Sequence, residues 1–345
     1  MFGIQRNILS VFCVVLAILI FAGSSATAGS KASRYKEPVI DPDILVDIHI
    51  PSKSWHGTTL LADNHRPERP RIIEVDMQGR IIWEYLLPRN LRRYTNPGFD
   101  VEWLANNNIL FLLPLKGVYE INRDGDTVWS YMDKKVSHDA DRLANGNTLV
   151  AFGGWDRMSD AQVKEIDPKG KMVWSWCAKN HFDKSPYKDI RDQGWTHTNA
   201  VSRLPNGNTL ISPRNFNFLV EVDPQGVVVR TIGEGILHHQ HDPEVLPDGH
   251  ILVANHHGPH RAIEIDPETS KIVWQSAILE RGAAPVRDAD RLPNGNTLIT
   301  GSTKIIEVTT DGEIVWQLIL KGAHLKGGKE RSGLGFYKAE RIGLH

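Results

Sequence analysis

The sequence predicts an all-β fold, a six-bladed β-propeller whose blades are four-stranded antiparallel sheets. The first observation is a repeated turn, Asn-Gly-Asn-Thr-Leu, with identical copies at Asn145, Asn206 and Asn294 and looser ones at Asn106 and Asp248. The second is a hairpin segment that follows each turn and recurs about every 45 residues, a spacing typical of propeller blades. The third is a spare copy of a blade's first strand near the C-terminus.

The hairpin segments supply the last two strands of each blade. Most contain an Asp-x-x-Gly or similar turn between apolar runs and end in tryptophan, which we interpret as blade packing. Asn-Gly turns join the first two strands, so each repeat holds four short strands. The six hairpin segments cover residues 72–83, 118–129, 163–174, 219–230, 263–274 and 305–316.

The two ends of the repeat array predict how the ring closes. The first repeat begins near Gly57 and has no copy of the segment that precedes the turn, whereas residues 337–342 match residues 138–143 position by position. We therefore expect the C-terminal strand to complete the first blade. Closure of this kind removes an exposed sheet edge.

The N-terminal region is predicted to lie outside the fold. Arg6, the apolar run 8–22 and Ala26-Thr27-Ala28 form the pattern of a cleavable signal peptide over residues 1–28. An uncleaved membrane anchor is the alternative. Residues 29–43 are polar and aperiodic and are interpreted as a linker, and residues 44–345 as the propeller. The expected location is the periplasm or the cell exterior, with no membrane contact after cleavage.

Composition excludes some functions. The formal net charge of −1 over 345 residues leaves no basic excess for nucleic-acid binding. Cys13 lies in the signal region, so Cys177 is left alone and the mature chain has no internal disulfide. The sequence does not indicate an oligomeric state.

One aligned position differs from repeat to repeat. The residue directly after this position is aspartate in most copies, which indicates that it serves the blade as a turn or backbone partner. The first strand of every blade lines the central channel, so the variable residues are expected to converge on one axis. Seven residues before each turn, the sequence reads Phe99, His138, Asn199, His241 and Arg287, with Tyr337 in the closing strand.

Further polar residues are predicted at the same mouth. His197 and His239 precede channel positions by two residues, and Arg214 and His256 end the following strands. An arginine suits a tetrahedral oxyanion and lowers the pKa of a nearby histidine, which keeps the imidazole neutral and nucleophilic. This set predicts transfer of an anionic group through a histidine intermediate.

Three other interpretations stay open: a metal site, a non-catalytic binding module, and a purely structural set of polar side chains that form hydrogen bonds in a water-filled channel. Three neutral imidazoles on one axis can bind zinc, as in a metal-dependent propeller hydrolase or lyase, although Arg214 would repel a cation. A propeller can also be a non-catalytic binding module. The insertion 177–194, with Phe182 and Tyr187, is expected to overhang the pocket and shape a site for an aromatic acceptor.

A family resemblance rests on motifs in a fixed order. The chain resembles the bacterial arylsulfate sulfotransferases, which act without a nucleotide donor, over nearly all of its length from about Gly57. The motifs that carry the resemblance are His138-Asp139, Trp195-Thr196-His197-Thr198-Asn199, Ser212-Pro213-Arg214-Asn215 and Gln240-His241-Asp242.

The resemblance implies a six-bladed propeller that moves a sulfuryl group from a phenolic sulfate ester to another phenol. It implies that His241 is the nucleophile that becomes sulfated. His138, His197 and Arg214 would bind the sulfuryl oxygens, and His138 or His197 would assist proton transfer. No cofactor and no resident metal are expected.

The remaining channel positions are expected to contact substrate. The expected partners are small molecules, an aryl sulfate and a phenol. The predicted substrate-binding residues are Asn199, His239, His256, Arg287 and Tyr337.

Overall fold

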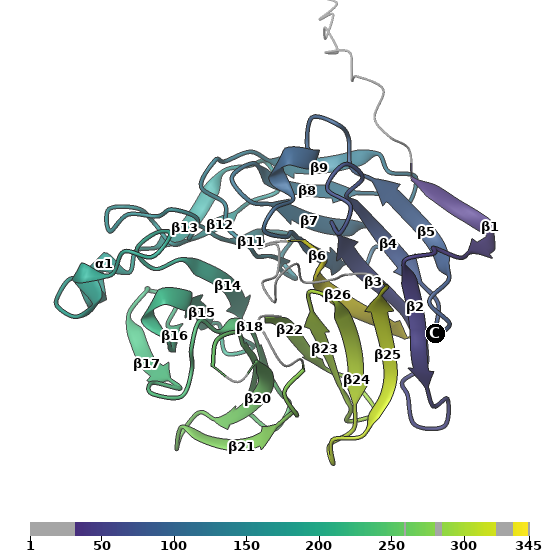
Figure 1. Cartoon of the computed structure of the whole chain (residues 1–345). Helices are drawn as coiled ribbons and strands as arrows, with labels where there is room; N and C mark the ends of the chain where they lie inside the picture. Colours follow the sequence, from purple (N-terminus) through teal and green to yellow (C-terminus); the bar gives the residue numbers. More distant parts are fainter. Residues whose placement is uncertain (1–31, 259, 280–284, 322–333, 344–345) are drawn as a thin grey trace, which may run out of the picture.

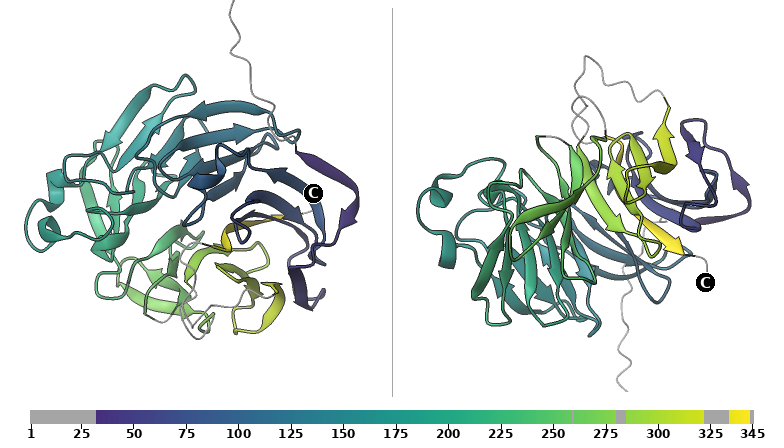
Figure 2. Two further views of the ribbon diagram at one scale, coloured as in Figure 1. Left: turned by 45° about the horizontal axis from the view of Figure 1, so that its top comes forward. Right: turned by 90° about the horizontal axis from the view of Figure 1, so that it is seen from below.

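The computed structural model describes residues 32–258, 260–279, 285–321 and 334–343. Its strands form six small antiparallel sheets arranged in a ring (Figures 1 and 2), so the predicted six-bladed β-propeller is confirmed. The predicted signal peptide, residues 1–28, lies outside the described residues. No helix within the described ranges is both long and apolar enough to cross a bilayer.

Four blades have the predicted four strands, in sequence order from the channel outward. Blade 2 holds β6 (Asp100–Trp103), β7 (Ile109–Leu113), β8 (Gly117–Ile121) and β9 (Thr127–Tyr131). Blade 3 holds β10 (Ala140–Arg142), β11 (Thr148–Ala151), β12 (Val163–Ile166) and β13 (Met172–Trp176). Blade 4 holds β14 (Thr198–Arg203), β15 (Thr209–Pro213), β16 (Leu219–Val222) and β17 (Val228–Ile232). Blade 5 holds β18 (His241–Val245), β19 (Ile251–Asn255), β20 (Arg261–Asp266) and β21 (Lys271–Gln275).

The C-terminal strand closes the ring as the sequence predicts. Strand β26 (Phe336–Gly343) is the innermost strand of blade 1 and pairs antiparallel with β3, with Glu340 opposite Leu60. In Figure 1 this yellow strand lies beside the purple strands from the start of the chain. The rest of blade 1 is β3 (Gly57–Asp63), β4 (Arg71–Val75), β5 (Ile81–Leu86) and β1 (Ser33–Val39).

Two blades carry a fifth strand that the sequence analysis missed. Strand β1 pairs with the outer strand of blade 1, so part of the expected linker 29–43 is a strand. It lacks an apolar alternation because it lies at the sheet edge, where its Tyr35 hydroxyl donates to Glu84. Blade 6 comprises β22 (Val286–Arg291), β23 (Thr297–Gly301), β24 (Lys304–Val308), β25 (Ile314–Leu320) and the outer strand β2 (Ile44–His49).

The recurring tryptophans join neighbouring blades. Trp83 and Trp316 are fully buried, and Arg123 stacks its guanidinium over Trp83 at 4.3 Å from the ring centroid. Each indole N–H donates to a backbone carbonyl in the hairpin turn of the next blade, which explains why the residue recurs in five of the six repeats; blade 4 has Arg230 at this position. The pairs are Trp83–Arg123, Trp129–Pro168, Trp174–Pro224, Trp274–Thr310 and Trp316–Met77.

The repeated aspartates join the innermost strands. Three of the four repeated aspartates accept from a backbone N–H of the next blade, so for these three the predicted backbone partner is found. The fourth, Asp242, pairs with Lys338 instead. The three bonds help to fix the positions of the variable residues that precede these aspartates. The backbone N–H of Ala140 donates to Asp100, that of Val201 donates to Asp139, and that of Ala339 donates to Asp288.

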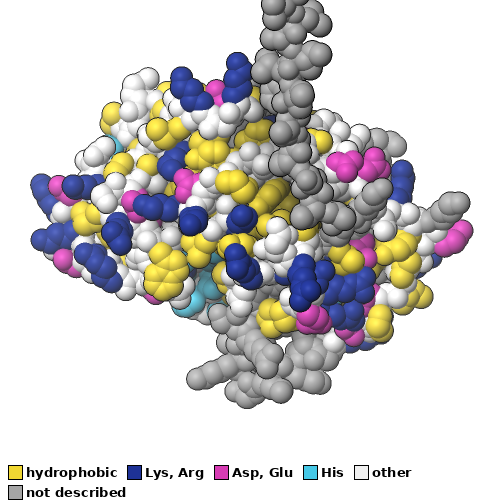
Figure 3. Space-filling model, turned by 90° about the horizontal axis from the view of Figure 1, so that it is seen from above, with side chains coloured by type: hydrophobic (Ala, Val, Ile, Leu, Met, Phe, Trp, Pro, Cys, Tyr) yellow, Lys and Arg dark blue, Asp and Glu magenta, His cyan; other side chains and the backbone are white. Residues whose placement is uncertain are grey.

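The outer surface carries charges of both signs. In the space-filling view of Figure 3, Lys and Arg side chains are spread over the visible face, with Asp and Glu side chains among them. Lys and Arg are the more prominent of the two on this face, whereas the net charge of −1 describes the whole sequence.

Candidate active site

Residues from five blades meet at one end of the channel. His138, Asn199, His241, Arg287 and Tyr337 line one narrow cavity, as the aligned variable position predicts. Phe99, at the same position in blade 2, instead belongs to the hydrophobic core between blades. Asp100, Asp139, Asp242 and Lys338 form the next layer of this cavity.

His241 is buried and holds a defined tautomer. Its Nδ1 lies 2.9 Å from the backbone carbonyl oxygen of His239, and a carbonyl oxygen can only accept, so Nδ1 carries the proton. Nε2 is therefore left with a free lone pair. Burial, and then the neighbouring His256, Arg214 and His138, hold the pKa of His241 well below its ordinary value. The imidazole is thus neutral at physiological pH.

His197 is fixed by a carboxylate that the sequence analysis did not single out. The backbone N–H groups of Trp195, Thr196 and His197 all donate to Asp156. His197 has a positive φ of 48°, and its Nδ1 donates to the carbonyl oxygen of Gln193 at 3.1 Å. Burial, and then the charge of Arg214, lower the pKa of His197 to about 4.

His138 lies between His197 and Tyr337. Its ring stacks on His197 at a centroid distance of 5.3 Å and tilts against Tyr337 at 5.8 Å. Its Nδ1 is buried and has no hydrogen-bond partner among the described residues. Burial, followed by the positive groups around it, holds the pKa of His138 well below its ordinary value. A buried nitrogen without a partner is ready for a bound ligand.

Arg214 lies where strand β15 ends, in the short helix η3 (Arg214–Phe216). Its Nη2 donates to Nδ1 of His239 at 3.0 Å, and its Nη1 donates to Asn215. The nearest carboxylate is Asp192, at 3.8 Å from Nη1 and about half exposed. Asp192 therefore neutralises the positive charge of the guanidinium only weakly, and that charge acts on the residues of the pocket. The guanidinium lowers the pKa values of several surrounding histidines.

Further histidines continue the site away from the axis. The ring of His256 stacks on His241 at 4.5 Å, and His257 lies 4.3 Å from His239 and 5.0 Å from His256. The pKa of His239 is lowered to about 4 by burial and then by Arg214. Because His239 accepts a hydrogen bond at Nδ1, its ring is neutral and its Nε2 carries the proton.

The remaining predicted residues serve partly structural roles. The Asn199 side-chain amide donates to the carbonyl oxygen of Gln240 at 2.9 Å, while its Oδ1 has no hydrogen-bond partner among the described residues. Arg287 donates to the carbonyl oxygen of Pro97 and lies 5.0 Å from the centroid of the Tyr337 ring. Burial raises the pKa of Tyr337, so this phenol keeps its proton.

The insertion meets the site differently from the prediction. Helix α1 (Lys179–Phe182) and the turn η2 (Tyr187–Asp189) place Phe182 and Tyr187 against Phe216 and Phe218 in a hydrophobic cluster. In Figure 1, α1 lies at the periphery of the ring. The aromatic residues therefore pack on the blades. The end of the insertion does reach the site, through Asp192 and Gln193.

Sequence reasoning overlooked the groups that hold the site together. Asp156 lies in the loop after β11, outside the aligned segments, so the comparison of repeats could not detect it. Lys338 was detectable: it stands where other repeats have aspartate. Its Nζ lies 3.3 Å from Asp100 and 3.3 Å from Asp242.

The channel histidines do not form a close ligand cluster. Among the described residues, three potential ligand atoms lie within 4.8 Å of one another in two groups, Asp248 with His250 and Glu264, and Asp242 with Asp288 and Asp290. Neither group contains a histidine of the channel mouth. With Arg214 beside them, these histidines form a site suited to an anion.

The fold has relatives among solved structures. A protein of unknown function from Bacteroides caccae has a TM-score of 0.57 at 20% identity, over 76% of this chain and 93% of that one. Virginiamycin B lyase from Staphylococcus aureus has a TM-score of 0.51 at 11% identity, over 83% of this chain and 88% of that one. A gluconolactonase from Xanthomonas campestris has a TM-score of 0.52 at 11% identity, over 86% of this chain and 90% of that one. At these identities the similarity is one of fold.

A comparison with family models is more specific. None of the curated proteins matches the chain. The family model described as arylsulfotransferase (ASST) matches residues 49–235, which is more than half of the chain and includes His138, His197 and Arg214. This match covers Arg214 and several of the residues that gather around it at the channel mouth. The chain therefore belongs to the arylsulfotransferases.

Proposed function

We propose that this protein transfers a sulfuryl group from a phenolic sulfate ester to a phenolic acceptor through a sulfated His241. In the first step, Nε2 of His241 attacks the sulfur of the ester. An N–S bond forms, the bond between sulfur and the aryl oxygen breaks, and the phenolate leaves. In the second step, the acceptor oxygen attacks the same sulfur, the N–S bond breaks, and neutral His241 is restored.

The observation that carries this proposal is the tautomer of His241. Its Nδ1–H donates to the carbonyl oxygen of His239, which leaves Nε2 as the nucleophilic nitrogen. When Nε2 bonds to sulfur, the imidazole ring gains positive charge, and the same carbonyl oxygen stabilises that charge. The depressed pKa supports the role, because a protonated imidazole has no lone pair.

Arg214 and the two stacked histidines complete the proposed mechanism. Sulfuryl transfer places negative charge on three oxygens, and a buried arginine with free donors is suited to bind them. His138 and His197 line the mouth and stack on each other. The phenolate leaves in the first step without a proton from these rings, because both are neutral. In the second step one of them accepts the proton of the acceptor phenol, and the resulting imidazolium ion is stabilised by the bound sulfuryl oxygens. The same ring returns to neutrality by transferring its proton to water.

The acceptor phenol loses its proton in the second step. A neutral histidine beside the sulfated nitrogen takes that proton as the acceptor oxygen attacks. We expect five residues to contact the aromatic ring of the acceptor or its hydroxyl. Asn199, Arg287 and Tyr337 line the cavity of His241, His256 stacks on His241, and His239 is bound to Arg214. We further infer from residues 1–28 that the reaction takes place outside the cytoplasm; an unprocessed N-terminus on the exported protein would contradict the cleavage.

The test uses a chromogenic aryl sulfate with and without added phenol. Release of the chromophore that needs the phenol, together with formation of the phenol's sulfate ester, supports transfer. Release at the same rate without phenol indicates hydrolysis instead and contradicts the proposal. His250→Asn is the matched control, because His250 lies on an exposed turn and pairs with Glu264.

A further inference from the structure

The channel beneath the histidines gathers carboxylates from two adjacent blades. Asp242 on β18 and Asp288 and Asp290 on β22 each offer an oxygen, and these three oxygens lie within 4.8 Å of one another. Close packing of like charges is costly unless a proton or a cation lies between them. The three residues play no part in the sulfuryl transfer proposed above.

Asp288 is the most constrained of the three. Its side chain is 1% exposed, and its Oδ2 already accepts from the N–H of Ala339 at 3.1 Å and from the hydroxyl of Thr300 at 3.4 Å. Its Oδ1 is buried and has no hydrogen-bond partner among the described residues. Oδ2 of Asp290 is likewise buried and has no hydrogen-bond partner among the described residues. Buried polar atoms of this kind normally have a partner.

Lys338 does not provide that partner. Its Nζ is shared among three carboxylates, Asp100 at 3.3 Å, Asp139 at 3.7 Å and Asp242 at 3.3 Å. Among the described residues it makes no ion pair within 4.0 Å with Asp288 or Asp290. A single ammonium group thus faces more negative charge than it can neutralise.

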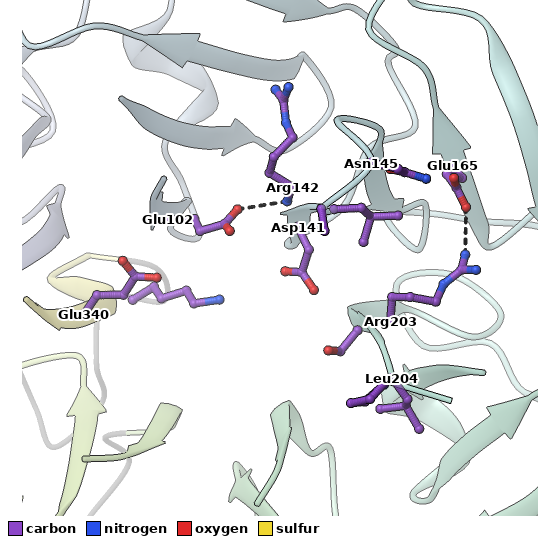
Figure 4. A pocket seen from close by; sticks show the side chains of 13 residues that line it. Glu102, Asp141, Arg142, Asn145, Glu165, Arg203, Leu204 and Glu340 are labelled. Carbon is purple, nitrogen blue, oxygen red and sulfur yellow. Dashed lines mark hydrogen bonds and ion pairs between the residues drawn. The ribbon is translucent and has the colours of Figure 1, made fainter. Parts of the chain in front are cut away.

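Further carboxylates surround the same axis. Glu102, Asp141 and Glu340 line a wider cavity of about 660 Å³ at the opposite mouth, where Figure 4 shows their side chains directed toward the open channel. Lys338 lines both this cavity and the narrow one under His241. Carboxylates from several blades therefore line both cavities of the channel, together with Lys338.

We propose that Asp242, Asp288 and Asp290 bind one hard divalent cation, with Ca²⁺ as the best match. All three ligands are carboxylate oxygens, the donors that Ca²⁺ and Mg²⁺ prefer, and the absence of nitrogen and sulfur among them disfavours zinc. Ca²⁺ tolerates irregular geometry better than Mg²⁺, which suits ligands from two blades, and water completes its coordination. The cation ties blade 5 to blade 6.

The competing explanation is a shared proton. Burial, followed by the neighbouring carboxylates, raises the pKa of both Asp288 and Asp290 well above the ordinary value. A protonated Asp288 could then donate to Asp242 with no metal present. The two explanations differ in whether the protein takes up a cation.

The experiment measures cation uptake directly. The mature protein is stripped with a chelator and dialysed against Ca²⁺ or Mg²⁺ at millimolar concentration; its bound metal and its melting temperature are then measured. We expect about one Ca²⁺ per chain, a dissociation constant of roughly 10⁻⁴ M or below, and a melting temperature that Ca²⁺ raises. Weaker binding of Mg²⁺ supports the assignment to Ca²⁺.

Variants locate the ion. Asp290→Asn should weaken Ca²⁺ binding at least tenfold and abolish the rise in melting temperature, while Asp141→Asn should leave both unchanged. Asp141 is the matched control because it occupies the same position on β10, outside the cluster. Wild-type protein that takes up no Ca²⁺ or Mg²⁺ and melts identically in chelator would overturn the proposal in favour of a shared proton. Equal loss of uptake in both variants would also overturn the assigned ligands.

Discussion

The Nδ1 atom of His241 lies 2.9 Å from the backbone carbonyl oxygen of His239. His239 in turn accepts a hydrogen bond at its own Nδ1 from Arg214 at 3.0 Å. These two contacts fix the tautomers of two histidines: Nε2 of His241 is a free base, and Nε2 of His239 carries a proton. The tautomer of the proposed nucleophile is set by the backbone of His239, and the tautomer of His239 is set by Arg214 from the neighbouring blade.

Replacing the nucleophile should remove transfer. We expect His241→Asn to lower kcat with an aryl sulfate by about 10³-fold or more, because the side-chain amide has no lone pair basic enough for attack. The measurement is chromophore release with saturating phenol, together with thermal melting. His250→Asn should keep wild-type activity. Near-normal turnover by a folded His241→Asn enzyme would remove this residue from the mechanism.

Replacing Arg214 should affect both binding of the transition state and the charge of its neighbours. We expect Arg214→Ala to lower kcat/KM by about 10²–10³-fold, or about 2.7–4 kcal/mol. The variant should also raise the pKa of His197 and His239 from about 4, because a nearby positive charge is lost. Arg214→Lys should retain the low pKa values but recover only part of the activity, since lysine lacks the planar fork.

Nuclear magnetic resonance titration measures the pKa values of the histidines independently of turnover, and so tests the predicted effect of Arg214 on their charge. In Arg214→Ala, unchanged histidine pKa values would mean that burial alone sets them. An activity loss without a pKa change would then assign Arg214 to ligand binding only.

The acidic channel predicts an unusual dependence of stability on pH. Burial, followed by the charge of Glu340, raises the pKa of Glu102 to about 8 from its ordinary value of 4.5. Between these two values the unfolded chain loses the proton and the folded chain keeps it, so Glu102 destabilises the fold progressively as pH rises from about 4.5 to 8. Glu102→Gln should remove this contribution.

The comparison is made by thermal or denaturant unfolding in chelator-containing buffer. The stability difference between Glu102→Gln and wild type should increase in favour of the variant from pH 5 to pH 8. The side-chain amide oxygen of the variant can still accept from the N–H of Arg142, as the Glu102 carboxylate does. A difference that is constant with pH would show that Glu102 titrates normally.

Closure of the ring by β26 predicts strong dependence on the C-terminal strand. A chain ending at Gly335 loses the innermost strand of blade 1 and exposes the edge of β3, so we expect it not to fold stably. A chain ending at Gly343 keeps the whole strand and is the matched control. Circular dichroism and melting compare the two. Equal melting of both chains would contradict the role of β26.

Most of the fold was predictable because its signals are repeated. The Asn-Gly turns and the tryptophans recur in most blades, and residues 337–342 copy the segment at 138–143. The outer strands β1 and β2 were not predictable in the same way. They lie at sheet edges and have no counterpart in the other repeats, so neither periodicity nor comparison of repeats could detect them.

The residues at the channel mouth were predictable for a related reason. The innermost strands share one backbone arrangement, so residues at one aligned position must converge, and His138, Asn199, His241, Arg287 and Tyr337 do. The supporting contacts come from loops without repeats. Asp156 holds the backbone before β14, and Asp192 reaches Arg214 from the insertion. These contacts depend on loop paths that sequence spacing does not determine.

The measurement that tests the central proposal most directly is a single exposure of the enzyme to excess chromogenic aryl sulfate without an acceptor. We expect a burst of about one phenol per chain and a sulfuryl group on the peptide that contains His241, which added phenol then removes. His241→Asn should give neither. Phenol-dependent transfer without any covalent adduct would mean direct transfer between the two substrates, and it would contradict a sulfohistidine intermediate.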